Sequence, residues 1–428
     1  MFKKIKNIVL KTDRLLYKKF GSDNSTKPLE NIKEAKIIFS CLNDIGKEST
    51  VRFVGGCVRK AICGDNIDDI DLATSFEPDE VKRRLNKENI KLVDTGISHG
   101  TVTVIINKKK FEITTLRKDV STDGRHAKVV FSKDWKKDSE RRDFTINSIY
   151  SDKDGNLFDP NNGKKDLENG LVNFIGDTDK RIKEDYLRIL RYLRFFLNYS
   201  KQPHNLHTIK SLKINIGGIS QLSKERLLDE LKKIIKIETL EILMRDKLSL
   251  ELIKMIFPEL KNIKIFSNMN IRKQHLLKKS DFIFMLSLMI IDGTDNVDYF
   301  LYKFNISNKD KKRIKNIDNF FKEKVNSKAF AENNMNKFFY YNGKETTIDI
   351  LNYRMIKLKK DDYSLNELCK HYENSVAPIM PINADLLMKN YEIPEGKLLG
   401  EKLKLIEEEW VKNNFKISDQ QVENIVKN

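Results

Sequence analysis

The chain has 428 residues, of which 39% are hydrophobic and 33% charged, which is an ordinary composition for a globular protein of several domains. Its formal net charge of +18 favours a polyanionic partner such as nucleic acid, although compositional drift toward Lys, Asn and Ile is the alternative. The longest apolar run, residues 282–291, is too short to cross a bilayer, so no membrane role is expected. The four cysteines form no CxxC pair, which argues against a zinc site or a disulfide framework and suits a reducing cytoplasm.

Arginine is distributed unevenly along the chain. Only 18 of the 80 basic residues are Arg, and 12 of these lie between Arg52 and Arg194. The planar guanidinium matches phosphates and base edges, whereas the Lys ammonium acts as a point charge. We therefore expect the chemistry of the protein in this segment.

In chain order, residues 1–30 form a basic segment that ends in the polar stretch GSDNSTKP. Residues 31–165 alternate short apolar runs with two helical stretches, 32–43 and 78–88, and are predicted to form a mixed sheet with helices. The expected strands are VRFVGG, DDIDLAT, GTVTVII, KKFEITTLR and TINSIYSD. Helical patterns then continue almost to the end. The predicted fold class is α+β: a head, an all-α neck over 166–240, and a helical body and tail over 241–428.

A pair of glycines ends the first expected strand, in FVGGCVRKAICG. A strand that passes through Gly55 and Gly56 into a helix lets backbone N–H groups approach a triphosphate closely. Arg59, one turn into the helix, is positioned to clamp that triphosphate. The alternative is a tight turn that uses glycine for its conformational freedom.

Two aspartates follow in GDNIDDIDLAT. Asp69 and Asp71 are two residues apart on an expected strand, so their carboxylates should share one face. Such a pair is costly unless cations lie between the charges, and it suits Mg²⁺ ions that activate a hydroxyl and stabilise a leaving pyrophosphate. A solvated acidic turn is the alternative. The glycine pair, Arg59 and both aspartates within 17 residues strengthen the site interpretation.

These motifs, VGGCVR and DDIDLAT, resemble the head of the class II tRNA nucleotidyltransferase and bacterial poly(A) polymerase family. The resemblance implies a DNA polymerase β-type nucleotidyltransferase head. Lys60 departs from the family, which usually has Asp after the Arg, and we expect that position to stabilise the helix. Glu112, on a neighbouring strand, is a candidate third carboxylate, although an ordinary edge-strand charge is equally compatible.

The segment ERRDFTINSIY resembles the family motif that contacts the ribose. The resemblance implies that Arg142 and Asp143 meet the phosphate and the ribose hydroxyls. A bare Arg-Arg-Asp in another context would be a solvated turn. The segment SKERLLDELKKII, residues 223–235, resembles a family helix that braces the neck, so we assign it packing rather than chemistry.

The segment KRIKEDYLRILRYLRFF is predicted to form a single amphipathic helix over residues 180–196. The residues expected on its buried face are Ile182, Tyr186, Ile189, Leu193 and Phe196. The residues expected on the opposite face are Glu184, Arg188 and Arg191, with Asp185 and Arg194 at its borders. A helix stabilised by ion pairs three residues apart is the alternative to a binding site.

The family resemblance assigns to Glu184, Asp185 and Arg188, the EDxxR motif, the role of a protein template for the incoming base. Cytosine and adenine both offer a ring-nitrogen acceptor beside an amine donor, so one carboxylate and one guanidinium can read both. Uracil and guanine present the reverse polarity and would leave buried groups unpaired. Arg191 and Arg194 are expected to support this pair or to meet phosphates.

The resemblance implies a CCA-adding enzyme that transfers C, C and A from CTP and ATP to the 3′ end of tRNA with Mg²⁺ at Asp69 and Asp71. The basic helical body is expected to bind the tRNA acceptor arm and T-arm by shape. Alternatives are a poly(A) polymerase and a partial CC-adding or A-adding enzyme. In the family a shortened loop at this place accompanies loss of A addition, so the resemblance favours full CCA addition, because the flexible segment between Leu116 and Arg142, which includes Arg125, is of substantial length. A non-catalytic RNA-binding protein is disfavoured because both aspartates are present.

Overall fold

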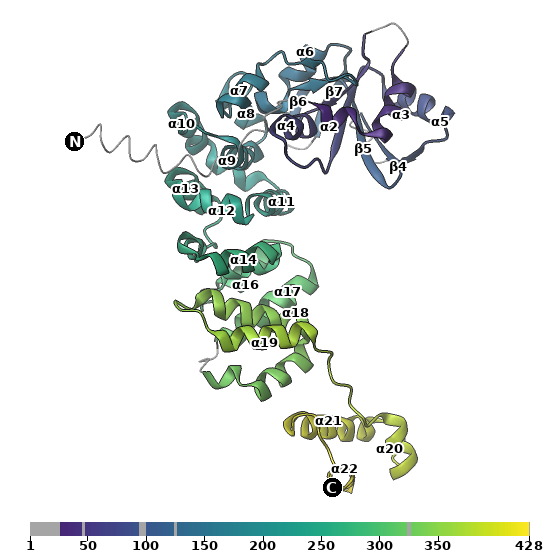
Figure 1. Ribbon diagram of the computed structural model, residues 1–428, viewed down its shortest axis with the longest axis vertical. Helices are drawn as coiled ribbons and strands as arrows, with labels where there is room; N and C mark the ends of the chain where they lie inside the picture. The colour runs from purple at the N-terminus through teal and green to yellow at the C-terminus, as the bar shows by residue number, and fades with distance from the viewer. Residues whose placement is uncertain (1–25, 45–47, 94–99, 124–125, 323–326, 428) are drawn as a thin grey trace, which may run out of the picture. The chain divides into compact units, whose positions relative to one another are not determined.

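The computed structural model describes residues 26–44, 48–93, 100–123, 126–322 and 327–427, so most of the basic N-terminal segment lies outside the described residues. The chain divides into two compact units, Met1–Ile234 and Ile235–Asn428. The first unit combines strands with helices, and the second is built of helices (Figure 1). This composition confirms the predicted fold class, a mixed-sheet head followed by a long helical region. The finer domain boundaries expected from the sequence remain predictions.

A mixed seven-stranded sheet forms the centre of the first unit, with the strand order β3-β4-β5-β2-β1-β8-β9. Its strands are β1 (Val51–Val54), β2 (Ile70–Thr74), β3 (Lys91–Val93), β4 (Thr101–Ile106), β5 (Lys109–Thr115), β8 (Tyr150–Ser151) and β9 (Leu157–Phe158). Strand β2 runs parallel to β5, and the other neighbours are antiparallel. Because β2 lies between β1 and β5, its residues lie at the centre of the strand order and not on an edge strand.

A separate hairpin of β6 (Arg117–Asp123) and β7 (His126–Phe131) follows β5 and forms its own two-stranded sheet. Its base is closed by the Ser132 N–H, which donates to the Leu116 carbonyl at 2.8 Å. The hairpin occupies much of the segment that the sequence predicts to be flexible. Arg125 of that segment lies outside the described residues.

The helices of the first unit surround the sheet and lead away from it (Figure 1). They are α2 (Lys27–Glu30), α3 (Lys33–Leu42), α4 (Gly56–Cys63), α5 (Pro78–Lys87), α6 (Trp135–Glu140), α7 (Gly163–Asn169), α8 (Thr178–Glu184), α9 (Leu187–Tyr199), α10 (Leu206–Asn215) and α11 (Lys224–Ile234). Helix α3 packs on α5, and both bury apolar side chains such as Ile38 and Leu85 completely. Burial of these faces, more than helix propensity, stabilises such short helices.

The strand expected over TINSIYSD is wrong for its first half. Residues Thr145–Asn147 form a 3-10 turn, and only the two residues of β8 pair with β1. The Ser148 hydroxyl donates to the Thr145 carbonyl at 2.9 Å, which satisfies the local backbone without a neighbouring strand. Short polar side chains compete with regular structure in this way, and the apolar alternation did not reveal it.

The single helix expected over residues 180–196 is also wrong, since α8 ends at Glu184 and α9 begins at Leu187. Asp185 between them is extended, with φ −156° and ψ 106°, and its Oδ1 accepts the Leu187 N–H at 3.1 Å. The break shifts the helical phase. Ile182, Ile189 and Leu193 are fully buried as expected. The two remaining residues of the predicted buried face, Tyr186 and Phe196, are only half-buried.

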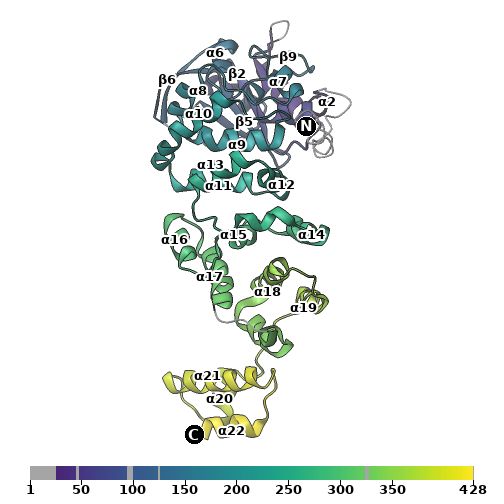
Figure 2. The ribbon, with the colours of Figure 1, turned by 90° about the vertical axis from the view of Figure 1, so that its left-hand side faces the viewer.

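The second unit consists of helices linked by loops, and its α-helices range from 8 to 26 residues. Its α-helices are α12 (Ile237–Arg245), α13 (Lys247–Ile256), α14 (Ile271–Lys279), α15 (Phe282–Ile290), α16 (Asn296–Lys303), α17 (Asn308–Lys322), α18 (Glu332–Lys357), α19 (Tyr363–Asn374), α20 (Ala384–Tyr391), α21 (Lys397–Lys412) and α22 (Asp419–Lys427). The last three lie side by side around buried Leu387, Ile406 and Val422 (Figure 2). Among the described residues, no helix has both the length and the apolar character needed to cross a lipid bilayer.

Candidate active site

The turn from β1 into α4 is built on two glycines. Gly55 has φ 69° and ψ −115°, a conformation that favours glycine, and its N–H donates to the Ile149 carbonyl at 3.1 Å. Gly56 is the first residue of α4, so the N–H groups of this first turn lack partners within the helix. The predicted phosphate-binding turn therefore has the backbone form that an anion site requires.

Carboxylates gather at the start of β2. Asp71 lies on β2 in register with Glu112 on the parallel strand β5, so the two side chains lie next to each other on one face of the sheet. Asp69 is exposed and precedes the strand by one residue, which differs from the expectation that both aspartates lie on the strand. Burial raises the pKa of Asp71, the charges of Glu112 and Asp69 raise it further, and the Arg142 guanidinium opposes them.

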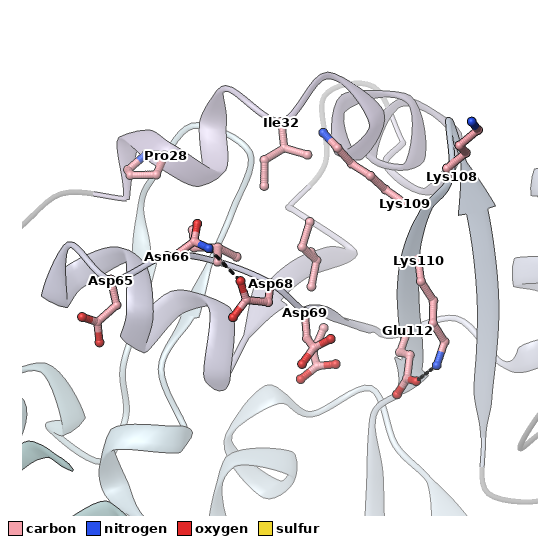
Figure 3. Close-up of a pocket in the computed structure, with 13 residues that line it drawn as sticks. Pro28, Ile32, Asp65, Asn66, Asp68, Asp69, Lys108, Lys109, Lys110 and Glu112 are labelled. Carbon is pink, nitrogen blue, oxygen red and sulfur yellow. Dashed lines mark hydrogen bonds and ion pairs between the residues drawn. The ribbon is translucent and has the colours of Figure 1, made fainter. Parts of the chain in front are cut away.

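A cavity of about 840 Å³ opens in front of these carboxylates (Figure 3). Asp69, just before β2, and Glu112, on β5, extend into it, and Lys110 donates to Glu112 Oε1 at 2.6 Å. Within the described residues, no three His, Cys, Asp or Glu side chains are arranged as a preformed metal cage. Two hard oxygen donors are nevertheless what Mg²⁺ commonly takes from a protein, because substrate phosphates and water complete its coordination.

Arg142 lies beside the glycine turn. A Cβ on Gly55 would approach the Arg142 NH1 atom to 3.4 Å. The other two nitrogens of the Arg142 guanidinium are held in place. Buried Asp138 accepts from NH2 at 3.2 Å, and the Tyr150 hydroxyl accepts from Nε at 3.1 Å. The guanidinium thus presents one nitrogen toward the turn while the rest of the fork is fixed.

Asp143 is 8% exposed and belongs to a chain of polar contacts between the head and α9. Its Oδ2 accepts from Arg191 Nε at 2.6 Å, and its Oδ1 accepts from Asn147 Nδ2 at 2.9 Å. Although burial by itself raises the pKa of Asp143, the Arg191 charge and the Asn147 hydrogen bond lower it to about 2. Asp143 is therefore ionised and held rigidly.

Arg59 is buried, with 6% of its surface exposed. Its NH1 donates to Asn147 Oδ1, and its guanidinium lies over the rings of Phe195 and Tyr199 at 4.7 and 4.9 Å. These contacts join α4 to α9. The predicted triphosphate contact of Arg59 remains a prediction, and the side chain also has a clear packing role.

The residues that the sequence predicts to read the base lie at the break between α8 and α9. Asp185 Oδ2 accepts from Arg226 NH2 at 2.8 Å, and Glu184 Oε2 accepts from Arg188 NH1 at 2.6 Å. Arg188 NH1 also donates to the Arg181 carbonyl at 2.8 Å. Among the hydrogen bonds of the described residues, none involves Nε or NH2 of Arg188, so these groups can donate to a base.

Helix α11, which was assigned to packing from the sequence, contributes two contacts to residues near the break and on α9. Arg226 binds Asp185, and Glu230, 1% exposed, accepts from Arg194 Nε. The scarcity of arginine outside residues 52–194 was the available signal for Arg226. Asp138 was also missed, although its position three and four residues before Arg141 and Arg142 is the spacing of neighbours on a helix.

Comparisons with known proteins agree on one family. Residues 51–173 match the model of the poly A polymerase head domain. The chain is 44% identical over 188 residues to the CCA tRNA nucleotidyltransferase 1, mitochondrial, of Danio rerio, which covers 43% of this chain and 44% of that protein. It is 32% identical over 327 residues to the CCA-adding enzyme of Staphylococcus haemolyticus, which covers 75% of this chain and 76% of that protein. The chain thus spans less than half of the first relative and about three quarters of the second.

Solved structures share the fold along most of the chain. The Bacillus stearothermophilus CCA-adding enzyme in complex with CTP superposes with a TM-score of 0.66 at 23% identity and covers 89% of this chain and 93% of its own. The Thermotoga maritima CCA-adding enzyme complexed with tRNA superposes with a TM-score of 0.57 at 20% identity, and the match covers 94% of this chain and 98% of that chain. At these identities the likeness establishes the fold of the chain.

Proposed function

Because this chain belongs to the family of CCA-adding enzymes, we propose that it is a CCA tRNA nucleotidyltransferase. It adds C, C and A to the 3′ end of tRNA, with CTP and ATP as donors and pyrophosphate as the leaving group. One observation carries this proposal: the Asp71 carboxylate lies in register with Glu112, and the rise that burial causes in its pKa is opposed by the charge of Arg142, a guanidinium that lies at the glycine turn. The proposal assigns cation binding to the carboxylates and phosphate binding to the glycine turn and Arg142.

Magnesium fits the donor set, since Asp69 and Asp71 provide the hard oxygen ligands that it prefers. When bound, the ion supplies activation of the attacking 3′ hydroxyl and stabilisation of the leaving pyrophosphate. Glu112 lies in register with Asp71 and adds negative charge on the same face. Gly56, Arg59 and Arg142 hold the triphosphate, and Asp143 orients the ribose hydroxyls.

The base is read at the start of α9. The Asp185 carboxylate accepts from the exocyclic amine of cytosine or adenine, and Arg188 donates to the adjacent ring nitrogen. Support comes from the fixed positions of both groups, because Arg226 holds Asp185 and Glu184 holds Arg188. Arg191 and Arg194 brace the reader through Asp143 and Glu230. Uracil and guanine place a donor against a donor, and such unpaired buried groups reject a base strongly.

The acceptor is tRNA, bound through its acceptor arm and T-arm by the basic helical body. The net charge of +18 and exposed lysines such as Lys278 and Lys279 on α14 support contacts to the phosphate backbone. A structural neighbour was solved with tRNA. The cysteines Cys41, Cys57, Cys63 and Cys369 form no disulfide with one another, which is compatible with the cytoplasm as the compartment.

The test offers the protein a tRNA transcript that lacks its 3′ CCA, together with Mg²⁺ and CTP, ATP or both. Products are resolved to single nucleotides, and Asp71→Ala serves as the inactive control. Two added C with CTP alone, and three nucleotides ending in A with both, are the expected results. A long ladder from ATP alone would identify a poly(A) polymerase, and a stop after two C would identify a CC-adding enzyme. No incorporation by the wild-type protein would overturn the proposal.

A further inference from the structure

Asp138, on the short helix α6, is a buried acid with no role in the reaction described above. Its side chain is 1% exposed. Burying a carboxylate is costly unless several donors satisfy it. The five contacts that Asp138 receives come from four residues in three segments of the head, which indicates why the charge is tolerated.

The two oxygens of Asp138 face different parts of the head. Oδ1 accepts from Arg141 Nε at 2.8 Å and from the backbone N–H of Arg117, the first residue of β6, at 3.3 Å. Oδ2 accepts from the Tyr150 hydroxyl at 2.7 Å and from Arg142 NH2 and Nε at 3.2 and 3.4 Å. Burial by itself raises the pKa of Asp138, but the charges of Arg142 and Arg141 and the Tyr150 hydrogen bond lower it to about 2. The group is therefore ionised at neutral pH.

These contacts determine how the Arg142 fork is oriented. Asp138 and Tyr150 engage Nε and NH2, while NH1 lies by the Gly55 turn. A guanidinium is planar, so fixing Nε and NH2 also fixes the direction of NH1. Without the carboxylate, the long Arg side chain would regain rotamer freedom, and each binding event would have to order it again.

We propose that Asp138 is a positioning residue that aims Arg142 at the triphosphate of the incoming nucleotide and ties this arginine to the base of the β6–β7 hairpin. The inference rests on the proposed function insofar as the bound ligand is CTP or ATP. Asp138 itself touches no substrate. It acts through Arg142, and its backbone contact with Arg117 makes the hairpin and the phosphate-binding arginine share one anchor.

A purely structural role would give a different result. Loss of a buried anion that only stabilises α6 would lower the unfolding temperature and leave nucleotide affinity intact in the folded protein. Asp134→Asn provides the matched control, because Asp134 caps the same helix and accepts from the Lys136 and Lys137 N–H groups, whereas Asp138 accepts from Arg142. Both variants exchange one carboxylate for an amide on α6.

The experiment measures the dissociation constant of CTP by calorimetry with Mg²⁺ and without RNA, for wild type, Asp138→Asn, Asp134→Asn, Arg142→Ala and the Asp138→Asn/Arg142→Ala double variant. We expect Asp138→Asn to weaken CTP binding about tenfold, as for a lost hydrogen bond to a charged group. Asp134→Asn should leave it unchanged. In the Arg142→Ala background, Asp138→Asn should raise the dissociation constant of CTP by less than about twofold, because the effects of residues that act through one another are not additive.

Fully additive effects, or a CTP affinity of Asp138→Asn equal to that of Asp134→Asn, would overturn the inference. If Asp138→Asn does not fold, Tyr150→Phe decides, since it removes a hydroxyl that contacts both Asp138 and Arg142. Unchanged CTP affinity in that variant would also refute the positioning role. Because binding is measured without RNA, a failure of CCA addition in the transcript assay leaves this result interpretable, whereas wild-type protein that binds no CTP would overturn both proposals.

Discussion

Each compact unit contains a cluster of arginine and carboxylate side chains around a buried group, but the two clusters have opposite proportions of charge. In the first unit, a single carboxylate, Asp138, is shared by Arg141 and Arg142. In the second, a single guanidinium, Arg313 on α17, is shared by Asp281, Glu345 and Asp349. Arg313 is 8% exposed, and it joins α17 to the start of α15 and to α18.

The proportions determine what each cluster can bind. Two positive charges around one carboxylate lower the pKa of Asp138 to about 2 and leave donors available for an anionic ligand. Around Arg313 the charges are reversed: burial raises the pKa of Asp349 to about 6 in spite of the guanidinium. The excess of arginine around Asp138 is therefore compatible with the proposed phosphate site, whereas the excess of carboxylate around Arg313 occupies its guanidinium with contacts inside the protein.

Asp71→Ala should have the largest effect on chemistry. We expect nucleotide addition to fall by at least about 1000-fold, since loss of a metal ligand removes several kcal/mol of transition-state stabilisation. Single-turnover addition of CTP to a tRNA lacking CCA measures this. Asp68→Ala is the control, because Asp68 is exposed and pairs with Lys60 next to the same strand. Equal losses in both variants would contradict the assignment of Asp71.

Arg313→Met should separate stability from binding. Removal of the shared guanidinium leaves three carboxylates facing one another, so we expect the free energy of unfolding to drop by about 3–5 kcal/mol. Denaturant titration measures the loss, and CTP affinity of the folded protein should not change. Lys309→Met removes a cation that contacts Glu345 from an exposed position and should cost less than about 0.5 kcal/mol. A large loss of CTP affinity in Arg313→Met would break the distinction between the two clusters.

Asp185→Asn tests whether the arginine-rich side of the comparison also selects the base. An amide can turn its N–H₂ toward the carbonyl of uracil, so discrimination against UTP should weaken by about 10- to 100-fold. The ratio of kcat/KM for CTP and UTP on a tRNA lacking CCA provides the measurement. Arg226→Met is the companion variant. It removes the partner of Asp185 but leaves the Asp185 carboxylate charged, so it should change the ratio less. An unaltered ratio in Asp185→Asn would exclude this residue as the reader.

Local spacing was enough to predict part of the site. The glycine turn and the position of Asp71 on a strand followed from local spacing, whereas the partners of Arg191 and Arg194 lie 48 and 36 positions away along the chain. The break at Asp185 was missed because helical periodicity continues through it, while the side chain of Asp185 satisfies the next turn. Its contact with Arg226 joins residues 41 positions apart and depends on how α11 packs against α9. The register of Asp71 with Glu112 likewise required the parallel pairing of β2 with β5, which spacing along the chain does not specify.

The smallest effect that we expect is an opposite response of the two clusters to acid. Asp138 has a folded-state pKa of about 2, below the usual value near 4, so its contribution to stability is present above about pH 4 and is lost as the pH falls toward 2. Asp349 has a folded-state pKa of about 6. The folded protein therefore takes up a proton between about pH 6 and pH 4, whereas the unfolded chain does not. Because of this uptake, the free energy of unfolding rises as the pH falls through this range. Hydrogen exchange of α6 and α18 amides at pH 7, 5 and 3 resolves the two regions, with an expected change of order 2 kcal/mol in each. If the exchange protection of α18 decreases between pH 7 and pH 5, Arg313 keeps Asp349 ionised. The two clusters would then respond to acid in the same direction, and the excess of carboxylate would not distinguish them.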